Sequence, residues 1–361
     1  MDKRKRGFRG SIPLLIVEII VLILSIGMMY VVIVMTKEVN HKNIDRELIH
    51  VNEELVRQEP TKAETADDEV KQEKKGCRNI ALFGVDARNG ELGKGTRSDT
   101  IMIASIDQDT QEIKLVSVFR DTYLNLGNDS YNKCNTAYAR GGPEQAINML
   151  NLNLDLVLTD YVTVGFSGLI DAVDALGGIE MEITDSEISH LNNYQLCMAE
   201  ELKVDYIPVT SSGRQHLNGM QATAYCRIRY TKGDDFRRAE RQREVLSAMM
   251  EKARGASLLE LTNLVNAVLP QVETSLDSNE ILSVLGSVAG YRLTASAGFP
   301  FEGARAGANV GSKGSCVIPM DLEENVRQLH QVLYPAEAYT PSREVQRING
   351  EIKEQTHEFI Q

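Results

Sequence analysis

Charged residues that could bind phosphate and a metal ion stand at the ends of three apolar segments in the first half of the sequence. They are Asp86, Arg97, Asp99, Arg120 and Asp121. Aspartate oxygens are typical ligands for a hard cation such as Mg²⁺, and arginine can hold a phosphate through two parallel hydrogen bonds. If these side chains meet in the folded protein, they could bind a phosphate together with a metal ion.

Three predicted strands would bring these side chains together. Residues 79–85 are a buried apolar run, and residues 100–106 and 112–119 are similar, with a polar hairpin loop at 107–111. If the first two strands are antiparallel, the end of the first, the start of the second and the end of the third lie at one edge of the sheet. The alternative is that each charged residue belongs only to a solvated loop.

A second group of basic residues lies further along the chain. Residues 224–230 predict a strand, on which Arg227 and Arg229 point to the same face. After a polar loop, a helix is predicted from about residue 237 to residue 253. Its apolar stripe consists of Val245, Leu246, Met249 and Ala253.

This stripe predicts which of the helix's first residues face the sheet. Extended back by one to two turns, it predicts an inward face of Arg238, Arg241 and Gln242. The outward face would consist of Arg237, Glu240 and Arg243. Arginines at a helix N-terminus are repelled by the helix dipole unless an anion is present, and free backbone N–H groups there also attract anions. A solvated basic face is the simpler alternative, but the inward direction favours a pyrophosphate site.

In the order of these residues, the chain resembles the LytR–CpsA–Psr family of cell-envelope proteins. The motifs that carry the resemblance are Asn79-Ile-Ala-Leu-Phe-Gly-Val-Asp86, Arg97-Ser-Asp-Thr100, Arg120-Asp-Thr122, Lys133-Cys-Asn-Thr-Ala-Tyr138 with Gly141-Gly142, Val173-Asp-Ala-Leu-Gly-Gly-Ile179, Leu217-Asn-Gly219, Arg227-Ile-Arg229, Asp235-Phe236, Arg238 and Arg241-Gln242. They fall within residues 77–255. Phe119 replaces the family's usual proline, and Cys134 and Thr136 replace isoleucine and alanine, changes that bear on loop shape rather than on charge.

The resemblance implies a Mg²⁺-dependent transferase of phosphorus-containing groups. Such an enzyme moves an anionic glycopolymer, teichoic acid or capsular polysaccharide, from a polyprenyl-pyrophosphate carrier to a peptidoglycan hydroxyl and releases polyprenyl phosphate. It implies that Asp86 and Asp99 hold Mg²⁺. The expected pyrophosphate ligands are Arg97, Arg120, Lys133, Arg227, Arg229, Arg238, Arg241 and Gln242. The expected catalytic residues are Asp99, Arg120 and Asp121, with an aspartate taking the proton of the attacking hydroxyl.

A polyprenyl carrier also needs an apolar cleft. Candidate walls are two predicted helices at residues 146–158 and 166–176, which carry apolar residues at helical spacing. These residues are Ile147, Leu150, Leu154, Phe166, Leu169, Ile170 and Val173. The alternative for each is an ordinary place in the core.

The N-terminal region predicts a single-pass membrane protein. Residues 11–35 are apolar apart from Glu18 and long enough to cross a bilayer as an uncleaved helix. A basic tail at residues 1–10 precedes this run, so the N-terminus is expected in the cytoplasm and the remaining chain outside the cell membrane. The charged residues 36–76 predict a stalk that is helical near its start and a disordered tether near its end.

The remaining expectations concern the fold class, nucleic-acid binding and the cysteines. We expect an α/β domain, a central mixed β-sheet flanked by helices, at residues 77–335, and a polar C-terminal tail at 336–361. The net charge of −12 argues against nucleic-acid binding. Five cysteines without CxxC spacing predict no zinc or redox motif and mostly buried thiols, with a Cys197–Cys316 disulfide as the alternative.

Two other functions are compatible with the same predicted site. With water in place of the sugar hydroxyl, the protein would be a lipid-pyrophosphate hydrolase. As a non-catalytic envelope sensor or transcriptional regulator, it would need a signalling partner, because a domain outside the membrane cannot touch DNA.

Overall fold

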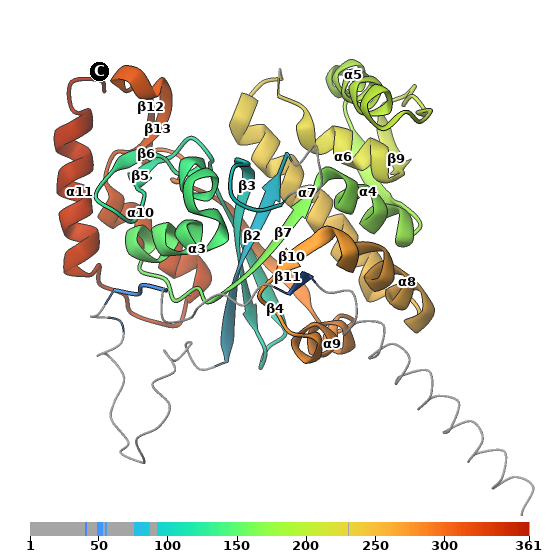
Figure 1. The fold of residues 1–361 in the computed structure, drawn as a ribbon, viewed down its shortest axis with the longest axis horizontal. Helices are drawn as coiled ribbons and strands as arrows, with labels where there is room; N and C mark the ends of the chain where they lie inside the picture. The colour runs from blue at the N-terminus through green and yellow to red at the C-terminus, as the bar shows by residue number, and fades with distance from the viewer. Residues whose placement is uncertain are drawn as a thin grey trace, which may run out of the picture.

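A seven-stranded mixed sheet forms the centre of the computed structural model, which describes residues 40–41, 49–52, 55, 76–86, 92–229 and 231–360. The strand order is β1-β10-β7-β2-β3-β4-β11, and helices lie on both sides of the sheet (Figure 1). In that order the strands span Asn40–His41, Val272–Thr274, Asp160–Gly165, Cys77–Val85, Ser98–Asp107, Glu112–Val118 and Arg292–Phe299. The expected α/β class with a mixed sheet is confirmed.

The three predicted strands are β2, β3 and β4. Strands β2 and β3 are antiparallel, with Val85 opposite Ser98, and β3 and β4 form the predicted antiparallel hairpin, with Met102 opposite Ser117. Their apolar side chains are buried on both faces of the sheet, as in central strands covered by helices. The end of β2, the start of β3 and the end of β4 therefore share one edge of the sheet, as predicted.

Two groups of helices cover the sheet (Figure 1). On one side lie α3, α10 and α11, which span Asn135–Leu154, Leu322–Leu333 and Arg343–Thr356. On the other side lie α4, α6 and α7, which span Phe166–Ala175, Gly219–Arg227 and Asp234–Arg254. The remaining elements are β5 Tyr123–Asn125, β6 Tyr131–Lys133, β8 Ile179–Ile183, α5 Asp185–Leu202, β9 Gly213–Leu217, α8 Leu258–Val268, η2 Leu269–Gln271, α9 Ser278–Ser287, β12 Arg305–Asn309, η3 Gly311–Lys313 and β13 Ser315–Pro319.

The strand predicted at residues 224–230 is wrong, because most of this segment is the end of helix α6. The Asn218 side chain accepts a hydrogen bond from Gln221 N at 2.9 Å, and the Gln221 side chain accepts one from Asn218 N at 2.9 Å. This capping box starts the helix upstream of the apparent strand pattern. Arg227 ends the helix and Arg229 follows it, so the two arginines do not share a strand face.

The polar tail predicted at residues 336–361 is also wrong, because this segment contains helix α11. The side chain of Ser342 caps the helix by accepting from Val345 N at 3.2 Å. Val345, Ile348 and Ile352 are fully buried and belong to the same hydrophobic core as the central strands. The domain therefore extends beyond its predicted end at residue 335.

The burial of α11 predicts a stability effect. Ile348→Val should destabilise the protein by about 0.5–1.5 kcal/mol, because it removes one methylene from a filled core position. Urea unfolding followed by circular dichroism measures this difference. Glu354→Gln, on the exposed side of the same helix, should stay close to wild type. Equal stability of both variants and wild type would contradict a structural role of α11.

Part of the predicted stalk packs on the domain. Asn40 and His41 pair with β10, and Ile49 is 1% exposed within the main core. The side chain of Asn52 donates hydrogen bonds to Leu152 O at 3.2 Å and to Asp155 Oδ1. At least these parts of residues 36–76 therefore belong to the folded domain rather than to a free stalk.

The predicted membrane anchor at residues 11–35 lies outside the described residues. Within the described ranges, no helix is long and apolar enough to span a bilayer. The five cysteines are free thiols; Cys316 is buried and Cys197 is exposed. The alternative of a disulfide between these two is therefore wrong.

Candidate functional site

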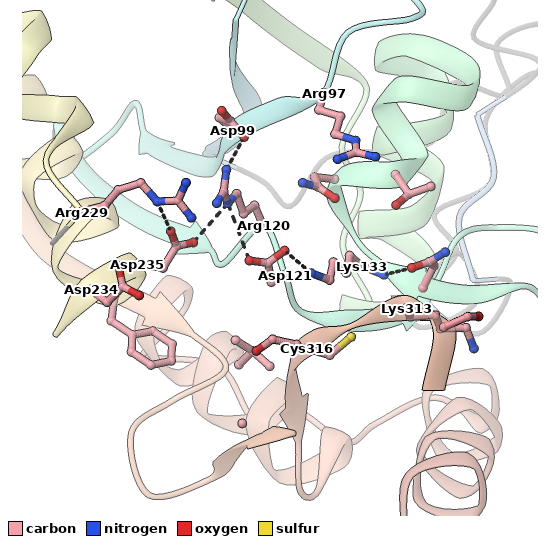
Figure 2. A pocket seen from close by; sticks show the side chains of 18 of the residues that line it. Arg97, Asp99, Arg120, Asp121, Lys133, Arg229, Asp234, Asp235, Lys313 and Cys316 are labelled. Atoms are coloured by element: carbon pink, nitrogen blue, oxygen red, sulfur yellow. Dashed lines mark hydrogen bonds and ion pairs between the residues drawn. The ribbon is translucent and has the colours of Figure 1, made fainter. Parts of the chain in front are cut away.

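The charged side chains at the sheet edge meet around Arg120, as Figure 2 shows. Arg120 Nη1 donates to Asp99 Oδ1 at 2.6 Å, and Arg120 Nε donates to Asp235 Oδ2 at 3.2 Å. Asp121 Oδ2 lies 3.7 Å from the same Nε, and its Oδ1 lies 3.1 Å from Lys133 Nζ. The structure thus brings Asp99, Arg120, Asp121 and Lys133 together.

This cluster holds Arg120 in its charged form. Burial lowers the pKa of the Arg120 guanidinium, but attraction by Asp235 and Asp99 outweighs burial, and the pKa lies above its usual value. The guanidinium is therefore a fixed positive charge with several anionic partners. A phosphate that enters the site would compete with these aspartates for the same donors.

A polar cavity of about 1060 Å³ opens beside the cluster. Its cationic lining residues are Arg97, Arg120, Lys133, Arg140, Arg229 and Lys313. Its anionic lining residues are Asp99, Asp121, Asp234 and Asp235. An excess of positive charge in one cavity of a chain with a net charge of −12 favours an anionic ligand.

A second cavity, of about 370 Å³, shares Asp99 and Arg229 with the polar one but has mainly apolar walls. Strands β2, β3 and β7 and helices α4 and α7 supply these walls. The apolar lining residues are Leu82, Phe83, Val85, Met102, Val162, Val164, Phe166, Leu169, Val245 and Leu246. The charged and amide side chains that join Asp99 and Arg229 in its lining are Asp86, Arg227, Arg238 and Gln242.

Two arginines outside helix α7, Arg227 and Arg229, line the apolar cavity, and Arg229 also lines the polar one. The Arg227 guanidinium lies 4.4 Å from the centre of the Phe166 ring and 5.6 Å from that of Tyr194, so cation–π contacts hold it in the lining of the apolar cavity. Arg229 Nε lies 3.5 Å from Asp235 Oδ1, and its side chain is 39% exposed. The two residues thus reach the same cavity, although the strand that predicted this is absent.

Arg238 is the most deeply buried arginine of this junction, with 6% of its surface exposed. Its Nη2 donates to Asp235 Oδ2 at 3.1 Å, whereas its Nε has no hydrogen-bond partner in the part of the chain that the structure describes. Burial lowers the pKa of Arg238, the positive charges of Arg120 and Arg229 lower it further, and nearby aspartates raise it only in part. A buried guanidinium with an unused donor would gain from an anion in the cavity.

Arg241 points inward as predicted but lines neither cavity. Its Nε donates to Glu187 Oε1 at 2.9 Å, and its Nη1 and Nη2 donate to Ile228 O at 3.1 Å and Thr231 Oγ1 at 2.7 Å. The side chain is 1% exposed. Arg241 is therefore a structural partner of Glu187. This geometry contradicts the expectation that Arg241 binds pyrophosphate.

The predicted outward face of helix α7 is only partly correct. Arg243 is buried, and its Nε donates to Ser296 Oγ at 2.8 Å. Arg237 is half-buried, and its Nη1 lies 2.5 Å from Glu244 Oε1 and 2.8 Å from Glu240 Oε2. Glu240 is exposed, as predicted, whereas Arg243 is buried because α7 packs against β11 at this position.

The apolar cavity contains only some of the residues expected to line a lipid cleft. Phe166 and Leu169 of α4 line the apolar cavity. Ile147, Leu150 and Leu154 of α3 are fully buried core residues on the other side of the sheet. Helical spacing in the sequence could not distinguish a core position from a position in a cleft. Val173 and Ile170 pack in the core beneath α6.

Sequence reasoning missed two parts of the site. Asp235 stood in a quoted motif but was given no role, and it contacts Arg120, Arg229 and Arg238. The second part is the hairpin β12–β13, whose residues from Gly307 to Val317 complete the wall of the polar cavity. The sequence of this hairpin carries no motif that would have placed it at the site.

The chain is similar in sequence to known teichoic acid transferases. TagV of Bacillus subtilis and TagU of Oceanobacillus iheyensis, both polyisoprenyl-teichoic acid–peptidoglycan teichoic acid transferases, are 29% and 30% identical to the chain over 231 and 226 residues. These alignments cover 62% and 60% of this chain and 56% and 65% of the relatives, so the chain spans less than two thirds of their length.

The fold is shared as well. The crystal structure of Bacillus subtilis TagV is 25% identical, with a TM-score of 0.56, and the similarity covers 74% of this chain and 100% of that structure. The LytR_cpsA_psr family matches residues 41–297, well over half of the sequence, and the resemblance expected from the motifs is confirmed. By this match and by its fold, the chain belongs to the LytR_cpsA_psr family.

Proposed function

We propose that this protein transfers an anionic glycopolymer from a polyprenyl-pyrophosphate carrier to a peptidoglycan hydroxyl. The observation that carries the proposal is the junction of a polar and an apolar cavity at Asp99 and Arg229. A lipid-linked glycopolymer has the same division, with an apolar tail, a central pyrophosphate and a polar chain. The names of the two teichoic acid transferases among the relatives support this reaction.

In the proposed complex, the arginines at the junction bind the pyrophosphate. Arg227, Arg238 and Gln242 approach it from the apolar cavity, Arg97 and Arg120 from the polar cavity, and Arg229 from both. Guanidinium donors aimed at phosphoryl oxygens stabilise the charge that develops in phosphoryl transfer. The polyprenyl chain lies between Phe166, Leu169 and the apolar strand residues.

The proposed reaction is an attack of a sugar hydroxyl on the phosphorus that carries the polymer. A new P–O bond forms at this phosphorus, its bond to the bridging oxygen breaks, and polyprenyl phosphate leaves with the bonding electrons. A carboxylate accepts the hydroxyl proton. Asp121 lines only the polar cavity, from which the acceptor would approach, and this favours Asp121 over Asp99 as the proton acceptor.

The donor set at the junction fits a magnesium ion. Asp86 and Asp99, at the ends of paired strands, both line the apolar cavity. Among the described residues, no three His, Cys, Asp or Glu side chains form a group suited to a metal, but Mg²⁺ often uses one or two carboxylates together with water and substrate phosphates. Held by Asp86 and Asp99, the ion would supply Lewis-acid stabilisation of a phosphoryl oxygen.

We further propose that the protein is located at the cell membrane. The apolar residues 11–35 would anchor it, with the basic residues 1–10 in the cytoplasm and the domain outside. This orientation places the cavities on the side of the membrane where peptidoglycan lies.

A transfer assay tests the function and its metal dependence together. Full-length protein in detergent, given Mg²⁺, a polyprenyl-pyrophosphate-linked teichoic acid and peptidoglycan, should attach the polymer to peptidoglycan. Excess EDTA, Asp86→Asn or Asp99→Asn should each slow the reaction roughly a hundredfold or more, because charge on the phosphoryl oxygens is no longer neutralised. Asp205→Asn, an exposed residue that lines neither cavity, is the matched control.

Each other outcome of this assay would identify a different alternative. Release of polymer that does not become attached to peptidoglycan would identify a hydrolase. Turnover that persists in EDTA would contradict the metal role while leaving the transferase intact. Absence of both reactions in the wild-type protein would refute the proposed function.

A further inference from the structure

The C-terminal hairpin β12–β13 forms a wall of the polar cavity that lies beyond the family match, which ends at residue 297. The short η3 helix connects the two strands, and Lys313 is its last residue. Ser312, Lys313 and Ser315 all line the cavity. This wall therefore lies outside the residues that the family match covers.

The hairpin is bonded to the segment that carries Arg120 and Asp121. Val317 N donates to Asp121 O at 2.9 Å, and Val317 also forms a parallel bridge with Thr122. Cys316 and Ile318 are 1% and 0% exposed and belong to the main core. The wall therefore has a fixed position relative to Arg120 and Asp121.

The side chain of Lys313 is positioned by a neutral partner. Its Nζ donates to Tyr123 Oη at 2.7 Å and lies 4.9 Å from the centre of the Tyr123 ring. Tyr123 Oη in turn donates to Gln355 Oε1 of helix α11 at 2.8 Å. An ammonium group has three donors, so Lys313 keeps donors for a ligand in the cavity and its charge is not cancelled by this partner.

The cations of the cavity fall into two groups. Arg120, Lys133 and Arg229 each form an ion pair with an aspartate of the site. For Arg97, Arg140 and Lys313, no ion pair exists within the described residues, and Arg140 Nη1 only donates to Ser130 Oγ at 3.3 Å. In Figure 2, Lys313 lies across the cavity from Arg229, so part of the uncompensated charge is remote from the junction with the apolar cavity.

We propose that Lys313 and Arg140 form a second anion subsite, which binds a phosphate or carboxylate group of the glycopolymer itself. This inference rests on the proposed function, since it takes the polymer as the occupant of the polar cavity. A pyrophosphate at the junction uses Arg229, which lines both cavities, and the other arginines assigned to it under the proposed function. The subsite on the hairpin wall then selects anionic over neutral polymers.

Direct binding tests this subsite without requiring turnover. The probes are a short glycerol phosphate oligomer, an uncharged glycan of similar length, and farnesyl pyrophosphate, each titrated calorimetrically into full-length protein in detergent. Wild type should bind the oligomer more tightly than the neutral glycan, and its affinity should fall with added salt. Lys313→Gln and Arg140→Gln should each raise the Kd of the oligomer roughly tenfold, because a charge-assisted hydrogen bond is lost.

The other probe and a control variant separate this subsite from the pyrophosphate site. Farnesyl pyrophosphate should bind the Lys313→Gln variant within about twofold of wild type, whereas Arg227→Gln should weaken farnesyl pyrophosphate and spare the oligomer. Lys252→Gln, an exposed lysine of α7 outside both cavities, should change neither Kd.

Three results would overturn the subsite. They are no preference of wild type for the anionic oligomer, an unchanged oligomer Kd in Lys313→Gln, and an equal loss for both anionic probes in that variant. Failure of the proposed function would look different, because wild type would then not bind farnesyl pyrophosphate, whatever its affinity for the oligomer.

Discussion

Arg241→Ala should destabilise the protein by about 3–5 kcal/mol, because it removes one partner of a buried ion pair. Arg241 and Glu187 have side chains that are 1% and 3% exposed, and the two are joined at 2.9 Å. The substitution leaves the Glu187 carboxylate buried beside Arg237 Nη2 at a distance of 3.7 Å. It also removes the donors that hold Ile228 and Thr231, which flank the loop that carries Arg229.

Urea unfolding of the two variants Arg241→Ala and Arg254→Ala measures this effect. Arg254 pairs with Glu251 near the surface, with exposed fractions of 32% and 65%, so its loss should cost less than about 1 kcal/mol. A double variant Glu187→Leu/Arg241→Met should recover most of the stability, because no unpaired charge stays buried. Wild-type stability of Arg241→Ala would show that the arginine serves ligand binding after all.

The cost of Arg241→Ala should depend on pH. Burial raises the pKa of Glu187, but hydrogen bonds from Thr184 and Arg241 outweigh burial, and the pKa lies below its usual value. In wild type, this pair therefore contributes stability above the pKa of the unfolded carboxyl, and the contribution is lost as the pH falls through the folded pKa. The difference between wild type and variant should accordingly shrink in acid.

The sheet edge was predictable because its signals are local. The strands β2, β3 and β4 are continuous apolar runs, and the short loop after Asp107 leaves an antiparallel hairpin as the simplest connection. Once their directions are known, Asp86, Asp99 and Arg120 must lie at one edge. No distant contact is needed for this conclusion.

The arginine cluster was only partly predictable because its partners are distant in sequence. The helical periodicity correctly predicted that Arg238 and Arg241 point inward. Periodicity cannot show that Arg241 pairs with Glu187 of α5 while Arg238 lines the cavity. For residues 224–230, alternating polarity suggested a strand, and the deciding signal was the capping box at Asn218, several residues upstream.

Two further elements differ in whether the sequence carried a signal that predicts them. Helix α11 was recognisable in principle, because Ser342 can cap a helix and Val345, Ile348 and Ile352 recur at helical spacing. The hairpin β12–β13, which carries Lys313, was not recognisable from the sequence. Its position depends on pairing between Val317 and Thr122, which are far apart in the chain. Such non-local pairing leaves no periodic trace.

Arg120→Gln should have the largest effect on activity, a loss in kcat/KM of about a hundred- to a thousandfold. Arg120 lies between Asp99, Asp121 and Asp235 at the edge where both cavities meet. Glutamine keeps a hydrogen-bond donor but removes the positive charge that would face the phosphoryl oxygens. It also leaves three aspartates close together, so an anionic substrate would meet repulsion where wild type offers attraction.

Arg120→Lys separates charge from geometry in the same transfer assay. Lysine restores the charge but cannot donate to two oxygens in a fixed plane, so its activity should lie between wild type and Arg120→Gln. Arg214→Gln, with a side chain that is 75% exposed, is the control and should keep wild-type activity. Thermal unfolding of each variant is needed beside the assay, because Arg120 also neutralises three partly buried aspartates. If Arg120→Gln lost activity only in proportion to its unfolded fraction, Arg120 would be a structural partner of Asp99 and Asp235, and the phosphoryl group would have to bind elsewhere.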